Sequence, residues 1–430
     1  MIDIRFIREN PDLTKLKVKQ KGYEENIDLV LELDNKRRSL LIEIEDLRKK
    51  RNELSHNKNY KDEQLLSNAK DLKQKIASSE DTLKEVEQFF NVEMHKIPNL
   101  ALDSVPIGSS EKDNLILRQV GEKKQFNFKP KLHHELANEL GLIDSVRAVK
   151  ISGSRFAYLK GDLVRLQLAL MNFVINTLSD ETLIKSIIEN NNLNISAKPF
   201  MPILPPALLK TEPYLASSRL NMEEVTYKIE QDDLWLNASA EHTLCTMYWN
   251  EIIPEKELPI RYIGYATSFR REAGTYGKDT EGIFRMHQFD KLEMEVFSSA
   301  KTGLEEHKLL VALQEHLMQK LELPYQVLQK CTFDIGKPNA TGVDIEAWLP
   351  GQEKYRETHT ADYMSDYQSR DLKIRLKNTD NSIELVHTND ATAFALGRIM
   401  IAILENYQLV DGHIAVPEVL IPYMIGKTRI

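Results

Sequence analysis

The sequence predicts an α+β protein that has an antiparallel sheet with flanking helices and a separate helical arm at its N-terminus. Three observations predict this class. Residues 28–96 are poor in glycine and proline and carry a leucine-rich heptad pattern. Residues 96–114 have the proline, glycine and serine content of a linker. The rest of the chain mixes short apolar runs with helical stretches and has no βαβ rhythm, which favours an antiparallel sheet.

The arm is predicted to be an antiparallel helical hairpin. Its heptad positions are Leu33, Leu40, Leu47 and Leu54, and then Leu65, Leu72, Ile76, Leu83, Val86 and Phe90. The polar segment SHNKNYKDEQ, residues 55–64, separates the two stripes. Periodicity alone leaves an oligomerisation coiled coil or a helical bundle equally open. The polar break favours the hairpin, because a parallel dimer has no use for a turn at its centre.

Length and composition set the domain organisation and the class of protein. A chain of 430 residues exceeds one ordinary core, so we expect an arm domain at 1–105, with its coiled coil at about 28–96, and a second domain at 106–430. No apolar run of about eighteen residues occurs, so we expect a cytoplasmic protein without a membrane partner. The net charge of −8 excludes general coating of nucleic acid but allows a local basic track.

Beyond the linker, the sequence predicts helices at 162–178 and 303–321. Apolar runs predict strands at 234–236, 259–269, 289–297, 341–350 and 382–389. The chain contains no GxGxxG, GxxxxGK[ST] or HExxH motif. An ATP site in this chain must therefore be built without the usual glycine-rich loops.

A charged hairpin at 269–297 is the strongest chemical signal that the residues give. In its second strand, alternation places Phe289, Lys291, Glu293 and Glu295 on one face and mainly apolar side chains on the other. Burial of several unpaired charges is costly, so the polar face is expected to meet a cleft or a ligand. Arg270 and Arg285 can then converge on an anion. An exposed, ion-paired hairpin is the alternative that this pattern leaves open.

Several motifs along the whole chain together carry a family resemblance. FRREAG followed by FRMHQFDKLE, and LVHTNDATAFALGR further on, resemble the second and third motifs of the class II aminoacyl-tRNA synthetases, in the form found in the seryl-tRNA synthetase family of bacterial type. PFMPILPPALL, at 199–209, is similar to the first motif, which forms the dimer interface. MIDIRFIRENPD and IPNLALDSVPIG resemble the two ends of the family's N-terminal arm.

The resemblance implies a fold, a reaction and a set of partners. The fold is an antiparallel sheet of six or seven strands with flanking helices, plus a coiled coil that holds tRNA. The reaction is ATP-dependent activation of L-serine to seryl adenylate, followed by transfer to the 3′ end of tRNA(Ser), with tRNA(Sec) as a second candidate acceptor. Mg²⁺ is implied as a cofactor. The family is homodimeric, and its arm reaches tRNA at the other subunit's active site.

Residues that match the family's nucleotide motifs are assigned by resemblance. Arg270 matches the arginine on the α-phosphate, Glu272 the contact to adenine, Arg285 the arginine near the γ-phosphate and Phe289 the ring stacked on adenine. Arg398 matches the third-motif arginine, and Arg270 and Arg398 are the catalytic candidates. Glu357 matches the metal-binding acid, and Thr360 stands at the second, hydroxyl ligand. Oxygen ligands shared with phosphates are what Mg²⁺ prefers.

The serine-binding candidates are Ser239, Glu241, Arg270, Glu293, Asp390 and Thr392. Two of them depart from the family pattern, since Ser239 stands for a usual threonine and Asp390 for a common asparagine. Asp390 either places a negative charge near the substrate ammonium or pairs with a local base. THTADY, at 358–363, also departs from a run that is usually rich in serine and cysteine. These departures put the geometry of the pocket in question, and no histidine is assigned as a general base.

Two rival functions remain open at this point. One is a seryl-adenylating paralogue that loads a carrier protein or another acceptor without tRNA. The other is a catalytically inactive, RNA-binding paralogue. The intact heptads argue against the first. The second is opposed by the joint retention of Arg270, Glu272, Arg285, Phe289, Glu293, Glu357 and Arg398.

Overall fold

The computed structural model describes residues 1–56, 63–220, 225–272 and 282–430, with side chains left out at 55, 56 and 63–66. Within these ranges the chain forms two compact units, Met1–Leu100 and Ala101–Ile430. This division lies five residues before the boundary after residue 105 that the sequence predicts. Inside the described ranges, none of the helices combines the length and the apolar character needed to cross a membrane.

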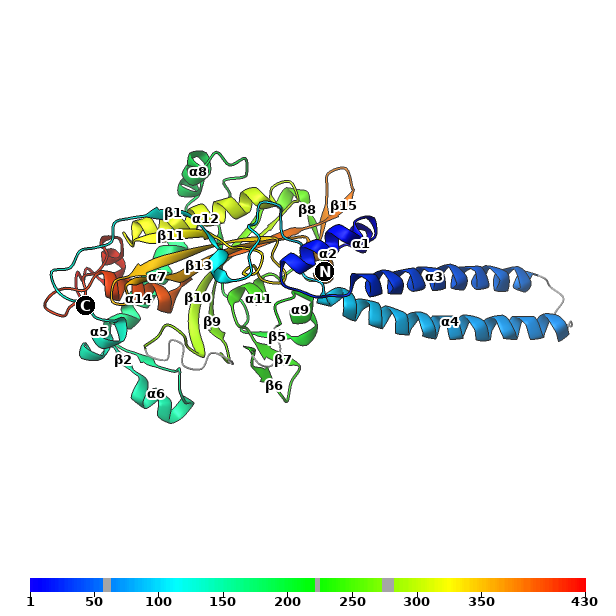
Figure 1. Cartoon of the computed structure of the whole chain (residues 1–430), viewed down its shortest axis with the longest axis horizontal. Coiled ribbons are helices and arrows are strands. Elements are labelled where there is room, and N and C mark those ends of the chain that lie inside the picture. Colours follow the sequence, from blue (N-terminus) through cyan, green and yellow to red (C-terminus); the bar gives the residue numbers. More distant parts are fainter. Residues whose placement is uncertain (57–62, 221–224, 273–281) are drawn as a thin grey trace. The chain divides into compact units, whose positions relative to one another are not determined.

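The N-terminal unit consists of α1 (Ile4–Glu9), α2 (Pro11–Gln20), α3 (Ile27–His56) and α4 (Glu63–Lys96). Helices α3 and α4 run side by side as a hairpin (Figure 1). The ion pair from Arg48 to Glu80 and the stacking of Arg37 on Phe90 establish the antiparallel direction, because residues further along α3 meet residues earlier in α4. The predicted antiparallel coiled coil is thus confirmed, although the centre of the predicted turn lies outside the described residues.

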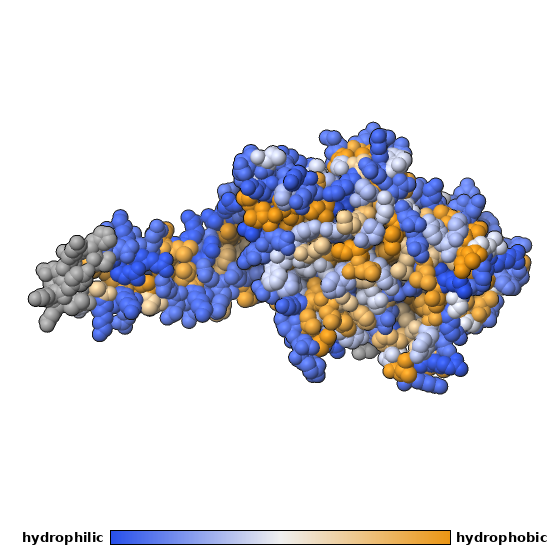
Figure 2. All heavy atoms as spheres, turned by 180° about the vertical axis from the view of Figure 1, so that it is seen from behind, coloured by the Kyte–Doolittle hydropathy of each residue, from blue (hydrophilic) through white to orange (hydrophobic). Residues whose placement is uncertain are grey.

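The seam of the hairpin is apolar, and its outer surface is mainly hydrophilic. Ile44, Ile76 and Val86 are each no more than 5% exposed, whereas hydrophilic residues dominate the outer surface of the hairpin (Figure 2). Near the base, Asp34 is fully buried on α3 and pairs with Arg8 of α1 and with Arg37. A buried carboxylate needs such partners, so this contact ties α1 to the hairpin.

The C-terminal unit is built on one large sheet whose order is β1-β11-β12-β13-β16-β10-β9-β4. Its strands are β1 (Leu115–Val120), β4 (Met201–Ile203), β9 (Ile260–Phe269), β10 (Gln288–Ser298), β11 (Tyr325–Gln329), β12 (Thr341–Leu349), β13 (Lys354–Ser365) and β16 (His387–Ala395). All neighbours are antiparallel except β4 and β9. The α+β class with an antiparallel sheet is confirmed.

The predicted strand number of six or seven is wrong for this sheet, which has eight strands in the described ranges. Strand β1 comes from the segment that follows the linker and β4 from the segment that resembles the first motif, and each adds one edge. The run predicted at 382–389 is also divided between two sheets. Its first part, β15 (Ile383–Leu385), pairs with β14 (Arg375–Lys377), and its second part begins β16.

Three small sheets and nine helices complete this unit in the described ranges. The small sheets contain β2 (Ile143–Asp144) with β3 (Tyr158–Leu159), β5 (Leu208–Lys210) with β7 (Leu234–Leu236) and β6 (Lys228–Ile229), and β15 with β14 and β8 (Ile252–Pro254). The helices are α5 (His133–Glu139), α6 (Ser145–Ser152), α7 (Asp162–Leu178), α8 (Glu181–Asn190), α9 (Thr211–Ala216), α11 (Ala240–Leu244), α12 (Gly303–Lys320), α13 (Tyr367–Leu372) and α14 (Leu396–Asn406). Both predicted helices, now α7 and α12, are confirmed.

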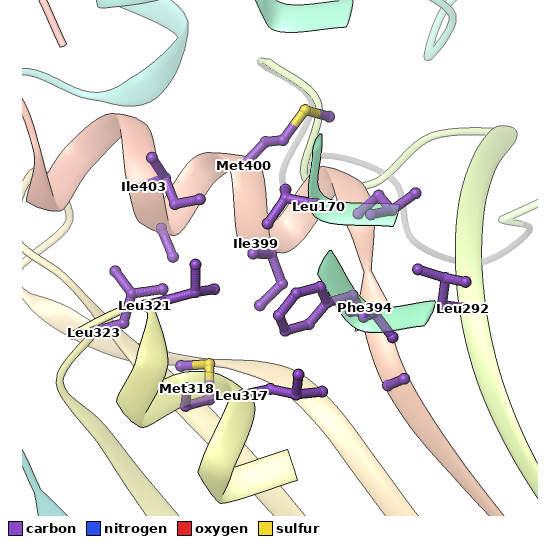
Figure 3. Packing of buried hydrophobic residues seen from close by; sticks show 14 of the residues in the cluster. Leu170, Leu292, Leu317, Met318, Leu321, Leu323, Phe394, Ile399, Met400 and Ile403 are labelled. Carbon is purple, nitrogen blue, oxygen red and sulfur yellow. The ribbon is translucent and has the colours of Figure 1, made fainter. Parts of the chain in front are cut away.

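The main core lies between the large sheet and the helices α7, α12 and α14. Figure 3 shows Leu292 of β10 and Phe394 of β16 next to Leu170, Leu317 and Ile399 from the three helices. All five side chains are fully buried. Because β10 alternates, the burial of Leu292 on this face turns its neighbours Lys291 and Glu293 to the opposite face. The core therefore decides which side of the sheet carries the charged residues.

Candidate active site

A cavity of about 340 Å³ opens on the charged face of the sheet. It brings together nine of the twelve predicted site residues, which are Glu241, Arg270, Glu272, Arg285, Phe289, Glu357, Thr360, Thr392 and Arg398. They come from α11, the ends of β9 and β10, β13, β16 and the first turn of α14. The cavity thus brings together residues of the second and third motifs, whereas no residue of the first-motif segment 199–209 lines it in the described ranges. Residues 273–281 of the charged hairpin lie outside the described residues.

One part of the cavity wall carries the arginines of the second and third motifs. Arg270 donates from Nε to the carbonyl of Ala238 at 3.0 Å, and its guanidinium carbon lies 5.2 Å from the centre of the Phe289 ring. Arg285 pairs with Glu272 at 2.8 Å. The arginines are held in place by protein partners, while the cavity remains open to a ligand. Such fixed cations suit an anion such as a polyphosphate.

Phe284 is an aromatic residue of the site that the sequence analysis did not single out. The centre of its ring lies close to two guanidinium groups, 3.8 Å from that of Arg356 and 5.0 Å from that of Arg398. Arg398 also pairs with Glu357 at 2.8 Å. Burial alone would raise the pKa of Glu357, but the charges of Arg398 and Lys330 lower it, so this carboxylate is ionised. Phe284 is the first residue of the FRMHQFDKLE motif, and only this position could have drawn attention to it.

The predicted metal ligands lie on one strand, β13, and face further oxygen donors. Thr360 Oγ1 accepts a hydrogen bond from Lys330 Nζ at 2.7 Å. Lys330 also pairs with Asp362 at 2.8 Å and with Asp344 at 3.3 Å. Burial raises the pKa of Asp344 to about 7. The donor set is therefore hydroxyl and carboxylate oxygen, which is the set that Mg²⁺ prefers.

Glu293 does not line the cavity itself but contacts two residues of its wall, Thr392 and Lys291. The side chain is fully buried and receives hydrogen bonds from Ser239 at 3.0 Å and Thr392 at 3.3 Å. Lys291 Nζ pairs with the same carboxylate at 2.5 Å. Burial raises the pKa of Glu293 to about 6, although Lys291 opposes the shift. This carboxylate is thus ionised at neutral pH and protonated in mildly acidic solution.

Asp390 is paired with Arg219, a residue that the sequence analysis missed. The Arg219 guanidinium contacts Asp390 closely and also lies 3.6 Å from Glu241. Arg219 lines the cavity, whereas Asp390 is 1% exposed and lies behind it. Burial raises the pKa of Asp390 well above its ordinary value even with Arg219 alongside. Of the two readings given for Asp390, pairing with a local base describes its position.

Three predicted serine-binding residues, Ser239, Glu293 and Asp390, do not line the cavity, and each is at most 1% exposed. They form a second layer behind Glu241, Thr392 and Arg219. Oxygen atoms of Glu241, Glu293 and Asp390 lie within 4.8 Å of one another, the kind of cluster that attracts a cation. Burial disfavours ionisation of Glu241, but Arg219 and His242 hold its pKa well below its ordinary value. A positively charged group in this part of the cavity therefore meets at least one permanent negative charge.

The missed residues share one cause. Arg219 lies just before a segment outside the described residues. Lys330 directly follows β11, and Asp344 lies on β12. All three are far from the second and third motifs along the chain. No periodicity or motif connects them to the site. Lys291 is different, because strand alternation already placed it on the same face as Glu293.

Comparisons with known proteins give matches to both units. Residues 1–101 match the family model for the seryl-tRNA synthetase N-terminal domain, and residues 226–407 match that for the class II tRNA synthetase core domain (G, H, P, S and T). The chain is 36% identical over 438 residues to the serine–tRNA ligase of Nitrosopumilus maritimus, with both chains covered completely. It is 39% identical over 433 residues to that of Borreliella burgdorferi, with 98% of each chain covered.

A solved structure of similar architecture is that of seryl-tRNA synthetase from Pyrococcus horikoshii complexed with ATP. Its TM-score is 0.90 at 37% identity, with 100% of the present chain and 99% of that chain covered. The similarity thus spans the arm and the sheet with its cavity. It agrees with the order in which the motifs occur along the chain.

The pairing of Arg219 gives a prediction for stability. Replacement of Arg219 by methionine should lower the free energy of unfolding of the C-terminal unit by about 3 kcal/mol, because two buried carboxylates lose their cation. All three tryptophans, Trp235, Trp249 and Trp348, belong to this unit, so urea unfolding followed by tryptophan fluorescence reports on it. Addition of Asp390→Asn to the variant should restore part of the loss.

The matched control is Arg118→Met. Arg118 pairs with Glu315 but has a side chain that is 44% exposed, so its loss should cost no more than about 1 kcal/mol. Equal losses in the free energy of unfolding for the two arginine substitutions would mean that the buried ion pair stabilises the protein no more than the exposed one does.

Proposed function

The chain belongs to the seryl-tRNA synthetase family of aminoacyl-tRNA ligases, and we propose that it activates L-serine with ATP and transfers it to the 3′ end of tRNA(Ser). The observation that carries this proposal is the composition of the single cavity described above. The wall includes Arg270, Arg285 and Arg398 with the rings of Phe284 and Phe289, and it also includes the carboxylate of Glu241 with the hydroxyl of Thr392. The first group suits the phosphates and base of ATP, and the second suits the ammonium group and hydroxyl of serine.

The first step joins a serine carboxylate oxygen to the α-phosphorus of ATP. The bond from that phosphorus to the bridging oxygen breaks, and pyrophosphate leaves with the electron pair. No proton needs to be removed from the carboxylate at neutral pH, and no histidine lines the cavity in its described part. Catalysis then depends on positioning and on fixed positive charge near the phosphates. We assign this role to Arg270 and Arg398 and the γ-phosphate contact to Arg285.

The nucleotide base is proposed to lie against Phe289, with Glu272 at the edge of adenine. Arg270 already approaches the Phe289 ring at 5.2 Å, so phosphate and base can be held by neighbouring residues. Phe284 also lines the cavity, and its ring centre lies 3.8 Å from the guanidinium carbon of Arg356 and 5.0 Å from that of Arg398. These cation–π contacts help to hold the arginines in place. The neighbouring arginines and rings support ATP as a substrate.

Mg²⁺ is proposed to bind at Glu357 and Thr360, with phosphate oxygens completing its shell. The oxygen donors and the excess of carboxylates near Asp344 and Asp362 fit this ion. A bound Mg²⁺ ion would neutralise part of the negative charge of the phosphates. The protein contributes the ion pair between Arg398 and Glu357, 2.8 Å apart, which keeps the Glu357 carboxylate ionised.

Serine selectivity is proposed to come from the wall formed by Glu241, Thr392 and Arg219, with Ser239, Glu293 and Asp390 behind it. Glu241 offers the ammonium group a carboxylate that stays ionised. Glu293 fixes the orientation of the Thr392 hydroxyl through their hydrogen bond. Selection of a small polar side chain requires such oriented hydrogen-bond partners, because size alone discriminates weakly.

The arm, residues 1–105, is proposed to bind the tRNA. Its long charged hairpin carries basic and acidic residues on an exposed surface, and recognition through backbone phosphates and shape suits such an element. tRNA(Sec) is a second candidate acceptor. The assignment to the bacterial type is also a proposal, since similar chains come from bacteria and archaea.

A homodimer is proposed to form through the segment that resembles the first motif. Met201 and Leu204 are 61% and 78% exposed there, and a shallow groove with Leu208, Met247 and Trp249 in its wall lies next to them. Figure 2 shows that hydrophobic side chains reach the surface of this unit in several places. The apolar area suits a second copy of the chain. A cytoplasmic location completes the proposal.

The proposed activity is tested by amino-acid-dependent ATP–pyrophosphate exchange with all twenty amino acids and Mg²⁺. Serine alone should support strong exchange, and Arg270→Ala should lower it by at least about 100-fold, because a transition-state contact worth about 3 kcal/mol is lost. An alanine variant that keeps its fold and its activity would remove Arg270 from the catalytic residues. Exchange with threonine, alanine or no amino acid would favour the carrier-loading or inactive paralogue.

Serine binding should depend on pH through Glu293. Its carboxyl has a pKa of about 6 in the folded protein, so it is ionised above this pH and protonated below it. The KM for serine at saturating ATP should therefore rise as the pH falls from 7.5 to 5.5. Glu293→Gln should remove most of this dependence, because the amide does not titrate. A KM that stays level in the wild type would show that the Glu293 charge does not influence serine.

Removal of residues 28–96, with a short linker in their place, should separate the two halves of the reaction. Charging of tRNA(Ser) should fall by at least about 100-fold in kcat/KM, since most phosphate contacts are lost, while serine-dependent exchange should stay within about twofold. In the intact protein, kcat/KM for tRNA should decrease steeply with salt. Loss of exchange together with charging would contradict separate roles for the arm and the sheet domain.

A further inference from the structure

A buried chain of hydrogen bonds runs from α9 to the cavity wall. Tyr214 on α9 is fully buried, and its Oη lies 2.5 Å from His242 Nδ1. The other ring nitrogen of His242, Nε2, lies 3.2 Å from Oε1 of Glu241. His242 and Glu241 are consecutive residues of α11. Neither Tyr214 nor His242 lines the cavity, so each can act on a ligand only through Glu241.

The donors around His242 fix which ring nitrogen carries the proton. The backbone N–H of Ala238 points to Nδ1 at 3.4 Å, and an amide can only donate. Nδ1 is therefore an acceptor, and it also accepts from the Tyr214 hydroxyl. The proton of the neutral ring must then be on Nε2, from which it is donated to Glu241. This assignment follows from hydrogen-bond partners on both sides of the ring.

The ring is neutral over the working range of pH. Burial lowers the pKa of His242 to about 4, even though the Glu241 carboxylate beside it favours the charged form. Burial also raises the pKa of Tyr214, so its hydroxyl keeps the proton that it donates. A neutral donor orients the Glu241 carboxylate without cancelling its charge. A protonated histidine would instead compete with a substrate cation for the same carboxylate.

Arg219 holds Glu241 from a second direction. Its Nη1 lies 3.6 Å from Oε1 of Glu241, and the opposite side of its guanidinium is bound to Asp390. The closest contacts of Arg219 and of His242 with Glu241 both involve Oε1. The carboxylate is thus held from two directions, and Glu241 itself lines the cavity, where a ligand can reach it.

We propose that Tyr214 and His242 are positioning residues for the amino group of the amino-acid substrate, because they hold Glu241 in the orientation that accepts it. This inference rests on the proposed function, in which Glu241 receives the serine ammonium group. Tyr214 acts through His242, and His242 acts through Glu241. The three residues therefore make the affinity for a primary ammonium group depend on a hydroxyl that lies outside the cavity.

The decisive test compares two adenylate analogues on the full chain. One is a sulfamoyl analogue of seryl adenylate, and the other is the same compound without its amino group. The wild type should bind the amino compound more tightly, and Tyr214→Phe should reduce that preference about tenfold, which corresponds to about 1.4 kcal/mol. Affinity for the compound without the amino group should not change. In exchange assays, the KM for serine should rise about tenfold while that for ATP stays constant.

The matched control is Tyr363→Phe. Tyr363 Oη lies 2.6 Å from His387 Nδ1, so the same pair of atoms is joined, but neither residue lines the cavity or contacts Glu241 through an ion pair. This variant should keep the wild-type preference for the amino compound. A reduction of the same size in both tyrosine variants would mean a general loss of packing and would overturn the proposal.

Variants of His242 provide an independent test. His242→Leu removes the donor to Glu241 and should reduce the preference at least as much as Tyr214→Phe does. His242→Gln can donate from its amide nitrogen and should recover part of it. Should His242→Leu fail to fold, the comparison of Tyr214→Phe with Tyr363→Phe decides. An unchanged preference in Tyr214→Phe would overturn the inference alone, whereas a wild type without serine-dependent exchange would refute the proposed function.

Discussion

The alternation of strand β10 is the constraint on which both the core and the cavity depend. Leu292, Met294 and Val296 are fully buried among α7, α12 and α14 on one face. Because successive side chains of a strand point to opposite faces, Lys291 and Glu293 must then lie on the other. The packing of the apolar core thus fixes the position of these two charged side chains on the opposite face of the sheet. A shift of one residue in the pairing of β10 would exchange the two faces and remove both features together.

Charge matching is the second condition, since the polar face of the sheet is itself buried. Glu293 is satisfied by Lys291, Asp390 by Arg219, and Asp362 by Lys330. Isolated, each of these groups would cost several kcal/mol to bury. The pairs therefore make a polar layer possible beneath the cavity. That layer positions the groups in the wall, which are the ones that a ligand can reach.

Glu295 shows the limit of this matching. It is fully buried on the same face as Glu293 and directly opposite Asp390 in the ladder between β10 and β16. Burial and the nearby Asp390 raise its pKa well above the ordinary value. This shift favours the protonated form, which avoids the cost of another buried charge. Protonation is thus a second way, besides ion pairing, to limit the negative charge of the layer.

The sequence predicted the elements and the motif residues well, because these depend on local patterns. The heptads of α3 and α4, the alternation of β10 and the helices α7 and α12 each follow from a period within one segment. The sequence could not show which serine-binding candidates line the cavity and which are buried behind its wall, because the exposure of a side chain depends on residues far away in the chain. Arg219 and Lys330 were missed for the same reason. Their partners, Asp390 and Asp362, became meaningful only when the sheet brought them together.

The two departures from the family pattern have different structural consequences. Asp390 adds a negative charge, but Arg219 lies between it and the cavity, so the charge is balanced before it reaches a ligand. Ser239 lacks a methyl group, yet its hydroxyl still bridges Glu293 and Lys291 at 3.0 and 3.2 Å. Both changes therefore occur in the second layer, where each residue has a partner of its own. The proposed serine-binding end can thus differ from the common pattern in residue type without a change in Glu241 and Thr392, which line the cavity.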